Sequence, residues 1–130
     1  MLNLLSSLDI IDTKNQFFIK YKELIENNLN NPKEKHKTQS HHIIPRSYYK
    51  QENLPLDNSK KNLVNLKYAD HILAHWYLYK CANKDYFQYS NLYALFYMLN
   101  TLKIPEDEEE LKLSLIHYGE VYTQYSILHS

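Results

Sequence analysis

Residues 41–75 contain the three most informative segments of the sequence: HHIIPR at 41–46, NLVNL at 62–66 and DHILAH at 70–75. His71 and His75 are four residues apart, so they share one face if this segment is helical. Two imidazoles at that spacing can bind one metal ion. Neighbouring residues such as His41 and His42 point to opposite faces of a strand, so one could face the metal and the other a substrate. The order strand, loop, strand, helix predicts that a strand histidine meets the helical pair.

The apolar pattern predicts an α+β fold that is mainly helical. Apolar residues recur at helical spacing in residues 14–30, 68–82 and 85–103, and Pro105 before EDEEE indicates a last helix over 106–125. Short strands are expected at 41–44 and 62–66, with the polar residues 47–61 forming a loop. The length suits one domain, 1–130, with a motif core at about 39–82 and helical flanks at 14–30, 85–103 and 106–125.

The composition excludes several kinds of protein. The single cysteine, Cys81, excludes an internal disulfide framework and a multi-cysteine zinc site. The single glycine argues against phosphate-binding glycine loops and against an all-β fold rich in tight turns. No apolar run approaches the ~20 residues that span a bilayer, so no membrane association is expected. The first eleven residues do not resemble a signal peptide, because they contain no basic residue and Asp9 interrupts their apolar stretch. We therefore expect a cytoplasmic protein.

The charge is unevenly distributed, although the chain as a whole is neutral. Residues 33–103 contain eleven lysines and arginines against five acidic residues, a net charge of +6. Residues 104–130 have a net charge of −5, and residues 1–32 a net charge of −1. The basic part of the chain is also the part that holds the histidine segments. A polyanionic partner responds to this local field rather than to the total charge, so a nucleic acid is compatible with the sequence.

The ordered set of histidines and Asn62 resembles the HNH, or ββα-metal, nucleases. The interval of nine residues from Asn62 to His71 and of four from His71 to His75 is similar to that in the nuclease domains of DNase colicins. The flanking segments YKELI, NLV and LYALFYML resemble those of small phage-encoded HNH homing-type endonucleases. Such relatives often have a Gly-Gly turn after the proline, Glu two residues before the histidine pair and Thr before the last helix. This chain has a glycine-free loop, Gln39 and Lys67 at these places.

The resemblance implies a role for each residue of the set. His41, His71 and His75 would bind one divalent metal ion (Zn, Ni, Mn or Mg), which would stabilise the leaving 3′ oxygen of a DNA phosphodiester. His42 would be the general base that takes a proton from water. Asn62 would hold the loop backbone and so orient His42. The setting would be the cytoplasm of a bacterial or phage-infected cell, with double-stranded DNA as the partner.

The remaining candidates have simpler interpretations. Arg46 could clamp a phosphate, and Lys60 and Lys61 could contact the DNA backbone, but exposed cations need no special role. Trp76 and the Tyr and Phe side chains of residues 85–103 are expected in the core, and Cys81 is expected as a buried small residue. His36, His117 and His129 are expected on the surface, and the acidic run 106–110 is expected to be a solvated helix start.

Three other functions stay open on the sequence. The first is a toxin-type nuclease that an acidic immunity partner neutralises. The second is a zinc-stapled DNA-binding domain that no longer cuts, for which His42 would be unnecessary. The third is a helical interaction protein whose histidines have no common role. If the protein cuts both DNA strands, it would need either a homodimer or two successive nicks.

Overall fold

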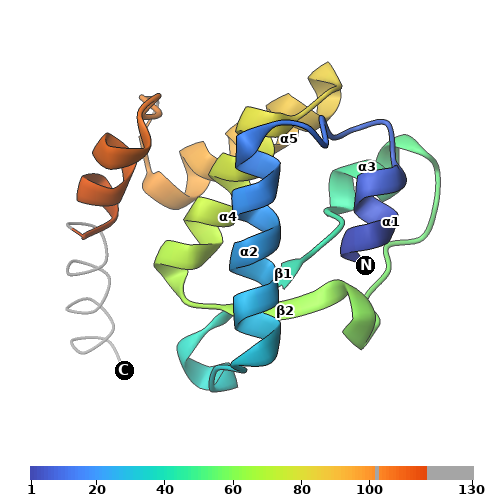
Figure 1. The fold of residues 1–130 in the computed structure, drawn as a ribbon, viewed down its shortest axis with the longest axis horizontal. Helices are drawn as coiled ribbons and strands as arrows, with labels where there is room; N and C mark the ends of the chain where they lie inside the picture. The colour runs from blue at the N-terminus through green and yellow to red at the C-terminus, as the bar shows by residue number, and fades with distance from the viewer. Residues whose placement is uncertain (102, 117–130) are drawn as a thin grey trace.

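The computed structural model describes residues 1–101 and 103–116, and these form a mainly helical α+β fold (Figure 1). Its helices and strands follow in the order α1 (Leu2–Ser7), α2 (Gln16–Asn30), β1 (Gln39–His42), α3 (Arg46–Gln51), β2 (Leu63–Leu66), α4 (Tyr68–Cys81) and α5 (Asp85–Leu99). Single 3₁₀ turns, Lys35–Lys37 and Lys60–Asn62, precede the two strands, and residues 108–116 are helical. No helix among the described residues is long and apolar enough to cross a membrane.

The two strands form an antiparallel pair that lies beside α4. Gln39 pairs with Leu66 and His42 with Leu63, so Val64 is opposite His41. Strand β2 runs directly into α4, and Leu66 and Ile72 are fully buried where the two meet the core. This arrangement sets the β1 side chains against one face of α4.

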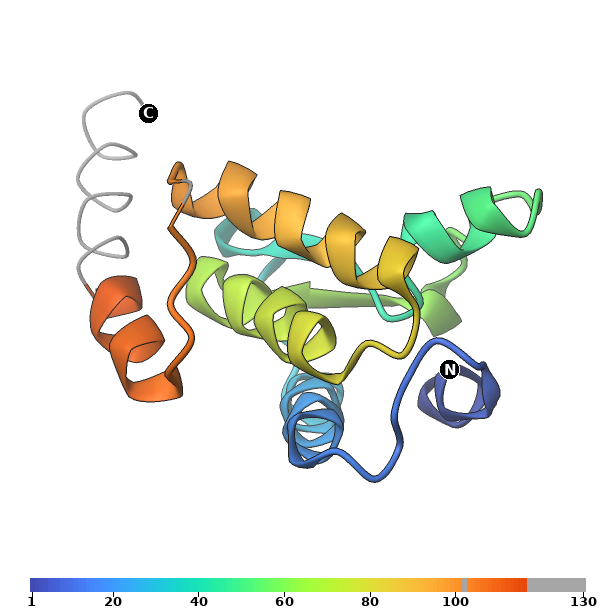
Figure 2. The same cartoon turned by 90° about the horizontal axis from the view of Figure 1, so that it is seen from above.

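Helix α4 is the central element, because it packs against α2 on one side and α5 on the other (Figure 2). Its Trp76 is fully buried, lies edge-on to Phe17 of α2 and donates its indole N–H to the carbonyl of Pro105 over 2.8 Å. Helix α2 begins where the Asn15 side chain accepts a hydrogen bond of 2.8 Å from the backbone N–H of Phe17. Leu111 and Leu115 also join the buried core.

The N-terminal segment caps the end of α4, which has no glycine to end it. The backbone N–H of Asp12 donates to the Cys81 carbonyl over 2.9 Å, and the Asn15 amide donates to the Lys80 carbonyl over 3.3 Å. In return, the N–H of Asn83 donates to the carbonyl of Ile10 over 2.7 Å. The bonds to Cys81 and Lys80 satisfy carbonyls that the last turn of a helix leaves without partners.

Several expectations are confirmed and several are wrong. The helices at 14–30, 68–82 and 85–103 form as α2, α4 and α5, although α5 ends at Leu99, where Asn100 adopts a left-handed conformation. The strand expected at 41–44 is shifted, since β1 spans Gln39–His42. Residues 46–51 form α3 rather than a loop, and Leu2–Ser7 form a helix that we did not predict. The part of the predicted helix 106–125 beyond residue 116, with His117 and His129, lies outside the described residues.

The aromatic residues of α5 divide between core and surface. Phe87 is fully buried as expected, but the expectation that the tyrosines are buried is wrong for Tyr89, Tyr93 and Tyr97, which are 57%, 71% and 89% exposed. These tyrosines recur every four residues, half a helix turn from the buried stripe that contains Phe87 and Leu95. Cys81 is buried as expected, at 1% exposure.

Candidate metal centre

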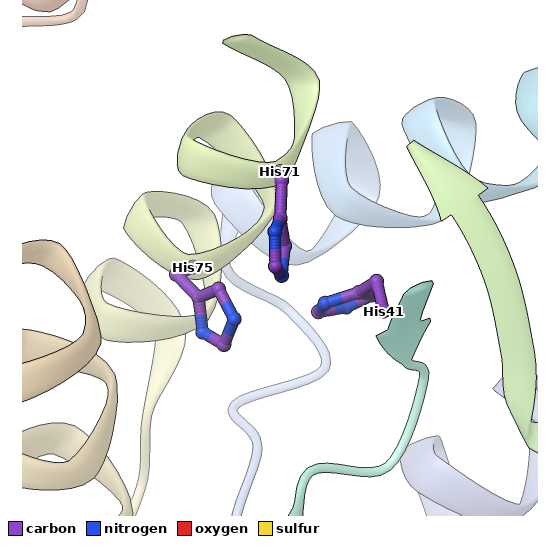
Figure 3. A group of neighbouring side chains, drawn as sticks. All are labelled: His41, His71 and His75. Carbon is purple, nitrogen blue, oxygen red and sulfur yellow. The ribbon is translucent and has the colours of Figure 1, made fainter. Parts of the chain in front are cut away.

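Three histidine rings converge between β1 and α4 (Figure 3). His41 comes from β1, and His71 and His75 come from successive turns of α4. One ring nitrogen from each histidine lies within 4.8 Å of the others, and the ring centroids are 5.0 to 5.2 Å apart. The expected meeting of a strand histidine with the helical pair is therefore confirmed, and this cluster could hold a metal ion.

The second nitrogen of His41 is occupied by a hydrogen bond to α2. The Tyr21 hydroxyl lies 2.9 Å from His41 Nε2 and donates to the carbonyl of Ile43 over 2.9 Å. Because the hydroxyl proton is used by that carbonyl, the Tyr21 oxygen accepts the Nε2–H of His41. This fixes the tautomer in which the Nδ1 of His41 has a free lone pair.

His71 and His75 are held in the same way by amide oxygens. His71 Nδ1 lies 2.7 Å from the Oε1 of Gln39, and His75 Nδ1 lies 2.8 Å from the Oδ1 of Asn91. The amide nitrogen of Asn91 donates to the carbonyl of Phe87, so its oxygen is the atom that accepts from His75. In both rings Nε2 then has the free lone pair. Such partners orient metal-binding histidines and set their tautomer.

Burial favours the uncharged form of all three rings. Desolvation, followed by the charge of the neighbouring His75, lowers the pKa of His71 to about 4. Desolvation also lowers the pKa of His75, against the opposing effect of its hydrogen bond to Asn91, and holds the pKa of the fully buried His41 well below its usual value. Histidine must be neutral to bind a metal, so the three side chains present suitable donors at neutral pH.

The sequence indicated no role for the three residues that hold these rings, namely Tyr21, Gln39 and Asn91, and Gln39 stood out only as a departure from the resembled motif. Asn91 had a usable signal, because it is the one amide in the four-residue repeat of Phe87, Leu95 and Leu99 on the buried face of α5. A polar side chain on such a stripe needs a buried partner. Tyr21 had no comparable signal, since a tyrosine on an apolar helix face is common in protein cores.

Asn62 is fully buried and all of its side-chain polar atoms contact backbone groups. Its Oδ1 accepts from the N–H of Ile44 over 2.8 Å, and its Nδ2 donates to the carbonyls of Ile44 over 3.1 Å and Asp57 over 2.9 Å. Its own carbonyl accepts from the N–H of Ile43 over 2.9 Å. Asn62 therefore ties the residues just after His42 to the segment that precedes β2.

His42 follows His41 on β1 and is only partly buried. Its Nε2 lies 2.8 Å from the Oδ1 of Asn58, which belongs to the polar segment 47–61 and for which the sequence indicated no role. Since an amide oxygen can only accept, the His42 Nε2–H donates to it and Nδ1 is left as the basic atom.

A cavity of about 430 Å³ opens beside the cluster, and both His41 and His42 line it together with His71 and His75. Arg46 and Lys50 of α3 line the same cavity, whereas the exposed Lys60 and Lys61 do not. Within the described part of the chain, no aspartate or glutamate lines it. The cavity therefore suits an anionic ligand.

Comparisons with known proteins leave the family open. No family model matches this chain, and no curated protein or solved structure gives a significant match. The likeness of residues 39–82 to a nuclease motif is thus an expectation from residue spacing, and function has to be argued from the side chains.

Proposed function

We propose that this protein is a metal-dependent endonuclease of the HNH type that hydrolyses phosphodiester bonds in DNA. The observation that carries the proposal is the shared cavity. Three neutral histidine donors and a separate histidine, His42, line it together with Arg46 and Lys50, and among the described residues no carboxylate lines it. A purely structural metal site would need neither His42 nor an open, basic cavity. In this proposal the two strands and α4 form the ββα-metal unit.

The three clustered histidines fit a divalent cation by their chemistry. Three neutral nitrogen donors with space beside them suit a catalytic ion rather than a closed structural site. Imidazole ligands favour zinc, nickel or a similar transition metal, whereas magnesium and manganese prefer oxygen donors. When bound, the ion supplies Lewis-acid stabilisation to the phosphate and to the leaving 3′ oxygen.

The chain's own residues would perform the proton transfer. His42 Nδ1 takes a proton from water while the water oxygen forms a bond to phosphorus. The bond from phosphorus to the 3′ oxygen breaks, and this oxygen gains a proton from solvent, so the products carry a 5′ phosphate and a 3′ hydroxyl. Asn58 holds the His42 ring by its Nε2–H, and Asn62 holds the backbone that follows His42.

A plasmid assay tests this proposal. The protein is freed of metal with EDTA and incubated with supercoiled plasmid and Mg²⁺, Mn²⁺, Ni²⁺ or Zn²⁺, beside the variants His42→Ala, His75→Ala and the control His36→Ala. His36 is exposed and outside the cluster, so its variant should nick like the parent. Loss of a general base should slow nicking by about 10²–10⁴-fold.

Metal content separates the two roles. His42→Ala should retain the metal, and His75→Ala should lose it. If no metal supports nicking, or if His42→Ala nicks as fast as the parent, the catalytic proposal fails. A parent that keeps its metal and binds DNA without nicking would instead be a zinc-stapled binding domain. Inhibition by an added acidic partner would indicate the toxin type.

A further inference from the structure

Helix α3 brings two cations to the histidine cavity. Arg46 and Lys50 are four residues apart, so they lie one turn from each other on the same side of α3. Both line the cavity that His41, His42, His71 and His75 also line. A flexible loop would not hold two cations side by side. Because residues 46–51 fold as a helix, Arg46 can act on a ligand together with Lys50.

Both cations are free to bind a ligand. Each is exposed, and within the described ranges 1–101 and 103–116 neither has a carboxylate within ion-pair distance. Other lysines are paired in this way: Lys84 lies 3.0 Å from Asp9, and Lys20 contacts Glu108. Two unpaired cations at one cavity leave a local positive charge that an anion can neutralise.

Packing holds α3 in place at the cavity rim. Tyr49 is 9% exposed and belongs to the core, and its carbonyl accepts from the N–H of Leu54 over 2.8 Å. On the other side, the Ser90 hydroxyl of α5 lies 2.8 Å from the Ser47 hydroxyl, within hydrogen-bond distance. Arg46 and Lys50 are thus presented by a short helix that contacts α5, and their positions relative to the histidines depend on these contacts.

We infer that Arg46 and Lys50 form a clamp for a backbone phosphate of the DNA strand next to the phosphate at the histidine cluster. The inference rests on the proposed function and assigns Lys50, together with Arg46, to substrate binding. Arginine offers paired N–H donors to phosphate oxygens, and lysine adds a point charge. The cavity of about 430 Å³ has the size of a small-ligand site, so it accommodates part of one strand's backbone rather than a duplex.

Binding measured without chemistry tests the clamp. The affinity for a fluorescently labelled DNA duplex is followed by anisotropy in EDTA over a range of KCl concentrations. Each phosphate contact adds about 0.9 to the slope of log affinity against log salt for B-DNA. The double variant Arg46→Gln/Lys50→Gln removes the contact with this one phosphate, so it should lower the magnitude of the slope by about 0.9 and weaken binding.

A matched control removes the same charge elsewhere. Lys14 and Lys22 do not line the cavity, and Lys14→Gln/Lys22→Gln should leave the slope close to that of the parent. Arg46 and Lys50 are exposed, so their variants should keep the parent's circular dichroism spectrum and urea midpoint.

The clamp is overturned if the parent does not bind the duplex, if the clamp variant keeps the parent's slope, or if the control variant loses as much. It is also overturned if a 5′ mononucleotide displaces the duplex at equal concentration, because the ligand would then be a free nucleotide. These outcomes are independent of the nicking assay. If the parent nicks plasmid but the clamp variant keeps the parent's slope, only the clamp is refuted. If the clamp variant loses slope but the parent never nicks, only the nuclease proposal is refuted.

Discussion

Replacing Asn62 by alanine should destabilise the protein by about 2–6 kcal/mol. The substitution removes three side-chain hydrogen bonds, two to Ile44 and one to Asp57. Ile44 is fully buried, so its backbone N–H would lose its partner without gaining water. An unsatisfied buried group costs about 1–3 kcal/mol, and each of the other two bonds contributes about 0.5–1.5 kcal/mol. A domain of this size has about 5–15 kcal/mol of stability in total, so the loss is measurable.

Urea denaturation followed by circular dichroism measures this loss, with metal removed so that ligand binding does not contribute. Amide hydrogen exchange gives a local check, because the Ile44 N–H should lose more protection than amides in α2. The matched control is Asn58→Ala, since the Oδ1 of Asn58 contacts the partly buried His42 and, among the described residues, no backbone group. It should cost less than about 1 kcal/mol.

A free energy change below about 0.5 kcal/mol for Asn62→Ala would refute this reasoning. So would an Ile44 amide that exchanges as slowly as in the parent. If the fold tolerates the change at low temperature, metal affinity should be nearly unchanged while nicking slows, because Asn62 acts on the backbone beside His42 and not on the metal ligands.

Three further predictions concern the same region. Gln39→Glu should tighten Co²⁺ binding about tenfold in isothermal titration, because a carboxylate makes His71 a more basic ligand; an unchanged affinity would contradict this. In EDTA, the free energy of unfolding should fall as the pH drops from about 6.5 toward 4. The reason is that His71 has a folded pKa of about 4, below its unfolded value, so the unfolded chain binds more protons in this range. The urea midpoint should change less between pH 7 and pH 5 in His71→Gln than in the parent or in His36→Gln. An equal change in all three proteins would contradict the role of His71 in this pH dependence. Cys81 should resist an aromatic disulfide reagent until urea unfolds the protein, since burial raises its thiol pKa to about 12; rapid labelling of the folded protein would disprove this.

The histidine cluster was predictable because it depends on local geometry. The spacing of His71 and His75 on a helix follows from the helix period. The run HHII also predicts a short strand that includes His41 and His42, although β1 begins two residues earlier than expected. Chain order then leaves few ways to place a strand beside the helix. The partners of the rings depend instead on how α2 and α5 pack against α4, and no local pattern encodes the contact between Tyr21 and His41.

Two errors have specific physical causes. Residues 46–51, RSYYKQ, are too short and polar to show a helical period, and they become helical where buried Tyr49 and the contact with α5 favour it. The α5 sequence has a single charged residue, Asp85, so its pattern could not indicate which aromatic side chains face solvent. Its outward face became known only from the burial of Phe87 and Leu95.

The hydrogen bonds that His41 and His75 donate to Tyr21 and Asn91 limit how far the histidine segment can be transferred between proteins. Residues 39–82 contain all three donor histidines, yet two of the three groups that orient the rings come from helices on either side of that segment. A graft of 39–82 into another scaffold would carry the ligands without the tautomer control of His41 and His75. A segment that keeps these contacts therefore extends from the start of α2 to the end of α5. A transfer of residues 39–82 alone should give a weaker, less selective metal site.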